Sequence, residues 1–180
     1  TMLFHDMGKP VMKTTDENGR DHFKGHAIAS EQIAKTVMKR LKFDNDTIRK
    51  VTKLVAYHDY RMEPTGANVR RAMHEIGVEL FPYYLAVRLA DTKAQSSYER
   101  RGKLENIIQI RELYRNALRN KECVTLKDLA VTGTDLINLG IAPGKELGTL
   151  LNELLDMVIE DPAWNQKGKL CDYVKERFGF

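Results

Sequence analysis

Apolar residues recur at intervals of three and four along almost the whole chain, which is the pattern of amphipathic helices that bury one face. No segment alternates strictly between apolar and polar residues, as a half-buried strand does. The exception to the helical pattern is residues 11–23, a polar stretch rich in turn-forming side chains, which predicts a loop. Helices are predicted over residues 26–41, 44–58, 67–76, 80–91, 98–120 and 143–159. The sequence therefore predicts an all-α protein.

Capping and helix-breaking residues set the expected ends of these helices. Asp44 is a good N-cap, and Pro143 can occupy a first helical turn, where its missing N–H does no harm. Asn165 is expected to cap a final helix that ends near Phe180. Gly8 and Pro10 are expected to end a helix that carries the residues before them.

Length and charge suggest how the chain is organised. A chain of 180 residues can form one domain or one domain with an appendage. The formal net charge is +4, and residues 99–121 alone carry seven basic and three acidic side chains, a balance of +4. We predict a helical domain over residues 1–98, followed over residues 99–180 by a long basic connecting helix and a helical tail.

Three arginines on the predicted connecting helix, Arg111, Arg115 and Arg119, recur at every fourth residue and form a basic stripe. Such a stripe is usually solvated surface. The alternative is contact with the phosphate backbone of RNA, which would be salt-sensitive and independent of sequence.

Several classes of protein are disfavoured by the composition. No run approaches the ~18 apolar residues of a membrane span, and the first residues are too short an apolar stretch for a signal peptide. Cys123 and Cys171 match neither a disulfide framework nor a zinc knuckle, so we expect both to be reduced. A cytoplasmic protein without a membrane partner is the default expectation.

Metal-ligating residues recur at the ends of the predicted helices or on the continuation of their apolar faces. They are His5, Asp6, His26, His58 and Asp91. A lone histidine in such a place is more often a hydrogen-bonded core residue, and Asp91 could instead pair with Arg88. Taken together, mixed imidazole and carboxylate ligands suit Mn²⁺, Ni²⁺, Fe²⁺, Co²⁺, Mg²⁺ or Zn²⁺. We therefore expect a divalent metal cofactor, with Asp6 able to bridge two cations.

Other histidines are weaker candidates for the metal site. His58-Asp59 is a second His-Asp pair, but no Gly-Lys follows it as Gly8-Lys9 follows His5-Asp6. His22 and His74 are expected to be ordinary surface residues.

The segment HDMGK, with Gly25-His26, His58 and Asp91, resembles the HD superfamily of metal-dependent phosphohydrolases. The resemblance implies an all-helical fold and a phosphate ester or nucleotide substrate. It matches Lys9 to a lysine that contacts phosphate, and Asp6 to a catalytic metal ligand. Members of the superfamily carry one more histidine ligand on a helix before the His-Asp pair, so residues 1–98 resemble an N-terminally truncated HD domain.

A narrower resemblance covers the whole chain. The segments LFHDMGKP, HFKGHAIAS, AYHDY, RLADTKAQ and DLAVTGTDLINLGIAPGKELGTLLNELL are similar to the C-terminal half of bacterial CCA-adding tRNA nucleotidyltransferases of the poly(A) polymerase family. In that family an N-terminal head adds the nucleotides, and its motifs are not found before His5. The resemblance implies tRNA as a partner and a tRNA-binding tail.

Two functions follow from these expectations. The first is an HD-type phosphohydrolase or phosphodiesterase that uses the metal ligands above. The second is a noncatalytic tRNA-binding body with a vestigial pocket, in which the arginine stripe contacts phosphates. The oligomeric state is open at this level.

Overall fold

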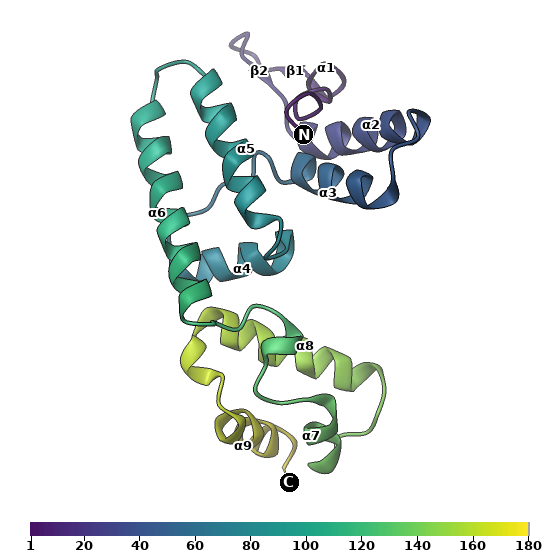
Figure 1. The fold of residues 1–180 in the computed structure, drawn as a ribbon, viewed down its shortest axis with the longest axis vertical. Coiled ribbons are helices and arrows are strands. Elements are labelled where there is room, and N and C mark those ends of the chain that lie inside the picture. The colour runs from purple at the N-terminus through teal and green to yellow at the C-terminus, as the bar shows by residue number, and fades with distance from the viewer. Residues whose placement is uncertain (180) are drawn as a thin grey trace. The chain divides into compact units, whose positions relative to one another are not determined.

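The computed structural model describes residues 1–179, and in this part of the chain nearly every element is a helix, which confirms the predicted all-α class (Figure 1). The principal elements are α1 (Lys9–Met12), β1 (Thr14–Thr15), β2 (Asp21–His22), α2 (His26–Arg40), α3 (Asn45–Ala56), α4 (Gly66–Ile76), α5 (Phe81–Ala94), α6 (Arg100–Arg119), α7 (Gly133–Asn138), α8 (Lys145–Glu160) and α9 (Lys167–Phe178). Two short 3-10 helices, Leu126–Asp128 and Pro162–Trp164, complete the list.

The N-terminal segment differs from the prediction. Residues 1–8 form successive turns, and α1 begins immediately after Gly8. Pro10 lies in the first turn of α1, so it begins a helix where we expected it to end one. The physical reason is that the first helical N–H groups have no intrahelical acceptor, and a proline therefore costs nothing there.

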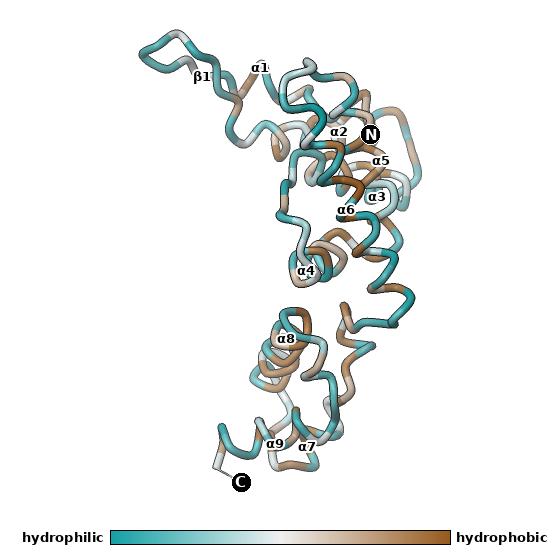
Figure 2. Tube along the Cα trace, turned by 90° about the vertical axis from the view of Figure 1, so that its left-hand side faces the viewer, coloured by the Kyte–Doolittle hydropathy of each residue, from teal (hydrophilic) through white to brown (hydrophobic). Residues whose placement is uncertain are grey.

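The predicted polar loop contains a small antiparallel hairpin that was not predicted. Thr14 pairs with His22 and Thr15 with Asp21, and all four residues are exposed. Figure 2 shows the region around β1 as mostly hydrophilic. Because neither face of these strands is buried, no alternating apolar pattern marks them in the sequence.

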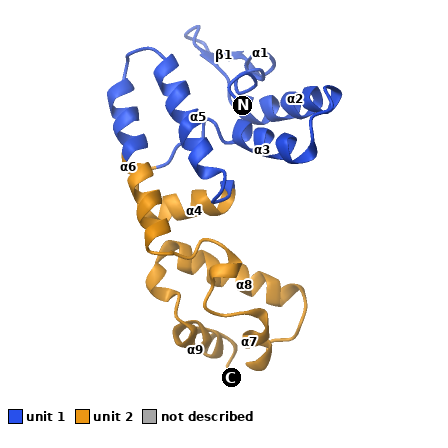
Figure 3. Ribbon diagram, viewed as in Figure 1, with its two compact units in different colours: residues 1–62, 76–108 blue, residues 63–75, 109–180 orange. Residues whose placement is uncertain are grey.

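The chain forms two compact units, drawn in different colours in Figure 3. Unit 1 comprises residues 1–62 and 76–108, and unit 2 comprises residues 63–75 and 109–180. Helix α6 begins in unit 1 and continues into unit 2. The predicted division of the chain into residues 1–98 and 99–180 stays a prediction.

Unit 1 is organised around α2 and α3, which run side by side in opposite directions (Figure 1). Ala34 and Met38 of α2 and Ile48 and Val55 of α3 are buried between helices. Asp44 caps α3 as predicted, because its carboxylate accepts a hydrogen bond of 2.8 Å from the backbone N–H of Thr47.

Unit 2 includes α4 because a buried arginine ties this helix to α8. Arg70 is 7% exposed, and its guanidinium donates to the backbone oxygens of Ile159 at 2.7 Å and Glu160 at 3.0 Å. It also pairs with the carboxylate of Glu122 at 2.7 Å. These carbonyls lie at the C-terminal end of α8, where no helical N–H remains to satisfy them. Arg70 therefore caps α8 and also pairs with a half-buried carboxylate.

The core of the tail is built from α7, α8 and α9, and the apolar side chains predicted on residues 147–159 supply its centre. Its fully buried members are Leu136, Leu154, Val158, Ile159, Leu170 and Val174. Thr132 and Asp135 form a capping box at the start of α7, in which each side chain accepts from the other's backbone N–H.

Two terminal residues of the tail helices lie differently from the prediction. Helix α8 begins at Lys145 with Gly144 as its N-cap, so Pro143 precedes the helix. Gln166, not Asn165, is the N-cap of α9. The Asn165 amide instead accepts from Ala130 N–H at 2.8 Å and donates to the Asp128 carbonyl at 3.0 Å, which joins two parts of the tail. Helix α9 ends at Phe178, and Phe180 lies outside the described residues.

Within residues 1–179, the helices are all too short or too polar to cross a lipid bilayer.

Candidate metal centre

Three of the five predicted metal ligands converge in unit 1. Asp6 lies in the turns before α1, His26 is the first residue of α2, and His58 lies in the turn that follows α3. One ligand atom from each lies within 4.8 Å of the other two. The Nε2 atoms of His26 and His58 are 3.5 Å and 3.6 Å from Asp6 Oδ1. This is the spacing of side chains that can share one cation.

The histidine rings are held in one orientation by the same local contact. Nδ1 of His5, His26 and His58 lies 2.7, 2.9 and 2.8 Å from the backbone oxygen three residues earlier. A carbonyl oxygen can only accept a hydrogen bond, so each Nδ1 carries the proton and donates. In a neutral ring this leaves Nε2 with a lone pair, as a metal ligand requires.

The Nε2 atoms of His26 and His58 face one another at 3.1 Å. With both Nδ1 atoms protonated, two neutral rings would direct lone pairs at each other. A proton on one Nε2 or a bound metal ion would relieve this contact. The residues present fit a metal ion, because a carboxylate oxygen of Asp6 completes a mixed nitrogen and oxygen set.

The other two predicted ligands form an adjacent pair. His5 Nε2 is 3.3 Å from Asp6 Oδ2 and 3.6 Å from Asp91 Oδ1. The second oxygen of Asp91 accepts a hydrogen bond of 2.8 Å from Gln95, the C-cap residue of α5. Among the described residues, Arg88 forms no ion pair with Asp91, so the structure favours the histidine partner. Gln95 was missed in the sequence, although its spacing of four residues from Asp91 on a helix is a usable signal.

The electrostatics favour the protonation states of a metal site. Burial alone would raise the pKa of Asp6, but the hydrogen bond from Lys9 and the nearby positive charges outweigh it and lower that pKa. Burial lowers the pKa of His58, which is 2% exposed. A metal ion binds the carboxylate anion and the neutral imidazole, which are the forms that these shifts stabilise.

Lys9 lies beside the candidate metal ligands, and its predicted phosphate contact stays a prediction. Its Nζ is 2.6 Å from Asp6 Oδ2, and 39% of its side chain is exposed. The ammonium group is thus held at the edge of the cluster and remains accessible to a ligand from solvent.

Gly8 allows the turn that carries Asp6 to lie directly on α2. Its backbone N–H donates to the hydroxyl of Ser30, which is fully buried, at 2.9 Å. A Cβ atom at this position would lie 2.4 Å from the backbone oxygen of His26 and 2.7 Å from the backbone nitrogen of Ser30. The glycine after the His-Asp pair therefore has a steric role that its sequence position alone does not reveal.

Replacing Gly8 by Ala should destabilise unit 1, because helix backbone cannot move aside as a flexible side chain can. We expect the free energy of unfolding to fall by about 1–3 kcal/mol, the usual cost of overpacking. Urea unfolding followed by circular dichroism would measure it. Gly102→Ala is the matched control, since a Cβ on this helical glycine meets nothing within 4 Å and should stabilise by about 0.5–1 kcal/mol. Equal stability of the Gly8→Ala and unaltered proteins would contradict the argument.

The remaining candidates lie away from the cluster. The Asp59 carboxylate of the second His-Asp pair accepts from Arg61 at 3.0 Å. His22 bonds to Asp16 in the exposed hairpin, and His74 bonds to the backbone oxygen of Val124. The stripe residues are all exposed on the part of α6 that belongs to unit 2: Arg111, Arg115 and Arg119.

The fold and the cluster together define an all-α protein in which two histidines and one aspartate lie close enough to share one cation. Comparison with known families adds a more specific result. A family model described as tRNA nucleotidyltransferase domain 2, putative, matches residues 26–174. The chain belongs to this family. The matched range includes His26, His58 and Asp91 and begins after His5 and Asp6.

A relative with a described activity supports the same assignment. A CC-adding tRNA nucleotidyltransferase of Thermus thermophilus is 29% identical over 164 residues, which cover 88% of this chain and 35% of the relative. The chain thus spans about a third of the length of this relative. No solved structure gives a significant match.

Proposed function

We propose that unit 1 is a metal-dependent phosphohydrolase of the HD type that acts on phosphate esters. The observation that carries the proposal is the convergence of His26 Nε2, His58 Nε2 and an oxygen of Asp6, with each histidine held by its Nδ1 in the ligand tautomer. The two Nε2 atoms lie 3.1 Å apart, and each is within 3.6 Å of Asp6 Oδ1, so one cation can contact all three ligand atoms.

Each residue of the cluster would have a distinct role. His26, His58 and Asp6 would hold the cation, and His5 and Asp91 would extend the site on the side of Asp6 Oδ2. Lys9 would bind a phosphoryl oxygen, since its ammonium group is partly exposed and already lies at the cluster. A divalent cation, when bound, lowers the pKa of a bound water and stabilises charge on phosphoryl oxygens.

The proposal is tested by hydrolysis of a generic phosphodiester, or of a 2′,3′-cyclic nucleotide, with Mn²⁺ or Ni²⁺ present. We expect Asp6→Ala to lose about 100-fold or more in kcat/KM, as removal of one electrostatic stabiliser does elsewhere. Asp21→Ala is the control, because this exposed carboxylate pairs with Lys13 on the hairpin. No metal-dependent hydrolysis by the unaltered protein would overturn the proposal.

A second function is compatible with the first, namely that the chain is a tRNA-binding body of a nucleotide-adding protein. It is supported by the family to which the chain belongs, by the printed activity of the Thermus thermophilus relative, and by the exposed arginines of α6. In this function the cluster could be vestigial, and phosphate contacts along α6 would supply the affinity.

A further inference from the structure

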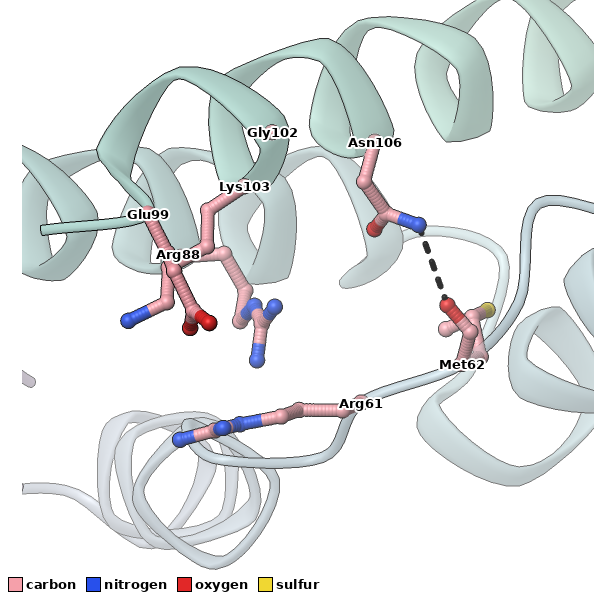
Figure 4. A pocket seen from close by; sticks show the side chains of 7 residues that line it. All are labelled: Arg61, Met62, Arg88, Glu99, Gly102, Lys103 and Asn106. Carbon is pink, nitrogen blue, oxygen red and sulfur yellow. Dashed lines mark hydrogen bonds between the residues drawn. The ribbon is translucent and has the colours of Figure 1, made fainter.

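A cavity in unit 1 is lined by several basic side chains and contains none of the predicted site residues (Figure 4). Its volume is about 560 Å³. Arg61 and Met62 line it from the segment after α3, Arg88 lines it from α5, and Lys103 and Asn106 line it from the first turns of α6. These residues are far apart in the sequence and meet only in the folded unit.

Hydrogen bonds fix the walls of this cavity. Asn106 donates from its side-chain amide to the backbone oxygen of Met62 at 3.3 Å, as Figure 4 shows. Arg88 donates to the backbone oxygen of Tyr60 at 3.2 Å, and the same oxygen accepts from the hydroxyl of Tyr84 at 2.7 Å. The segment at residues 60–62 is therefore held against both helices, and the cavity is formed before any ligand arrives.

The cavity carries an excess of positive charge. Arg61, Arg88 and Lys103 contribute three positive charges and Glu99 one negative charge, a balance of +2. Arg61 is paired with Asp59 at 3.0 Å. Within residues 1–179, neither Arg88 nor Lys103 has a carboxylate oxygen within 4.0 Å, although both side chains are half-buried. A partly desolvated cation without a counter-charge is costly, and an anion from solvent would relieve that cost.

Lys103 is positioned for such an anion by a neighbouring side chain. Its Nζ donates to the Gln95 side-chain oxygen at 3.0 Å, and the Gln95 amide group donates to Asp91. One of the three ammonium N–H groups is thereby used to fix the side chain, and the others remain for a ligand. The planar Arg88 guanidinium adds donors in the fork geometry that suits phosphate oxygens.

We propose that this cavity binds a phosphate ester of nucleotide size. Arg88 and Lys103 would hold the phosphate, with Arg61 at the open side, where 65% of its side chain is exposed. The cavity is far larger than a phosphate ion and falls in the range of about 300–1,000 Å³ typical of ligand pockets.

Met62 and the aliphatic stems of the basic residues supply an apolar wall for the organic part of the ligand, and Asn106 and Glu99 supply acceptors for its N–H or O–H groups. Binding here is separate from the hydrolytic function proposed for the metal cluster.

The test is calorimetric titration of the full chain in EDTA, so that the result does not depend on the metal cluster. The probes are AMP, ribose 5-phosphate, inorganic phosphate and adenosine. We expect AMP to bind saturably and at least about 10-fold more tightly than adenosine or inorganic phosphate. Lys103→Met and Arg88→Met should each weaken AMP binding by about 10-fold, the loss of one hydrogen bond to a charged group. Arg101→Met is the matched control on the same helix, since 94% of that side chain is exposed and it pairs with Glu105.

Each arm has an outcome that overturns part of the proposal. No saturable binding of AMP would remove the site. Equal affinity for adenosine and AMP would refute phosphate recognition, and equal affinity for inorganic phosphate and AMP would refute the nucleotide size. Unchanged AMP binding by Lys103→Met, or an equal loss in Arg101→Met, would place the ligand outside the cavity. Arg88 also donates to the backbone oxygen of Tyr60, so the circular dichroism spectrum of Arg88→Met is compared with that of the unaltered protein. If the two spectra differ, the AMP affinity of Lys103→Met alone decides whether the cavity is the binding site.

Discussion

His58→Gln should bind Mn²⁺ at least about 100-fold more weakly than the unaltered protein, and His26→Gln should show a loss of the same size. The expected effect is large because each ring directs its Nδ1 to a backbone oxygen and places its Nε2 close to Asp6. Even residues that only orient metal ligands cost about 10–100-fold when they are lost, and a ligand itself should cost more. Glutamine keeps a polar side chain of similar length but cannot place a nitrogen lone pair at the Nε2 position.

The measurement is Mn²⁺ titration followed by electron paramagnetic resonance, which counts free Mn²⁺ directly. His22→Gln is the control, because this ring bonds to Asp16 on the exposed hairpin, a few residues from His26. His58 is buried, so thermal unfolding of each variant in EDTA is needed to separate loss of a ligand from loss of the fold. Mn²⁺ affinity that is unchanged in a folded His58→Gln protein would show that the ring nitrogens share a proton and not a metal ion.

The helices of this chain were predictable because burial of one helical face leaves a periodic record in the sequence. Residues 26–40 and 45–56 illustrate this, since the observed helices begin and end within two residues of the predicted ones. Asp44 was predictable as a cap because the hydrogen bond it forms is local. Pro10 and Asn165 were not, because the role of each depends on what the neighbouring segment does, and hydrophobic periodicity carries no information about that.

The candidate site was predictable in its residue types but not in its geometry. A stripe that ends in His26 or His58 indicates that the ring faces the core, and it does not give the rotation of the ring. The orientation comes from the Nδ1 bonds to Phe23 and Val55 backbone oxygens, which depend on turns and not on periodicity. The grouping of Asp6 with these rings depends on the close approach of Gly8 to α2, a contact across more than twenty residues.

The basic cavity could not have been predicted at all. Arg61, Arg88 and Lys103 lie on three different segments. Only Lys103 belongs to the basic run over residues 99–121, and that run does not indicate that Lys103 meets the other two side chains. The arginine stripe on α6 is the opposite case, since one helix sets its geometry and the spacing alone brings it onto one face.

Replacing Arg111, Arg115 and Arg119 together by Gln should weaken tRNA binding and flatten its salt dependence. Each phosphate contact contributes about 0.7–0.9 to the slope of log K against log salt, so loss of three contacts should reduce the slope by about 2–3. Filter binding of a purified tRNA over a series of KCl concentrations gives both quantities. Glutamine retains the helix propensity of α6 and removes only the charge.

The control must remove the same charge elsewhere, since any loss of positive charge weakens binding to a polyanion. Lys35, Lys39 and Arg40 on α2 are exposed, and their replacement by Gln also lowers the formal net charge from +4 to +1.

The alternative is that the stripe has only a structural role. Arg115 pairs with Glu112 at 2.8 Å, and Arg119 lies in the last turn of α6, where the helix dipole stabilises a positive charge. If these arginines only stabilise the helix, replacing them should lower the stability of the protein slightly. The slope of log K for tRNA binding against log salt should then be equal in the two triple variants. A larger fall in slope for the α6 variant than for the α2 variant would assign the arginines to contact with RNA phosphates, because general electrostatic attraction depends on net charge, which is the same in both.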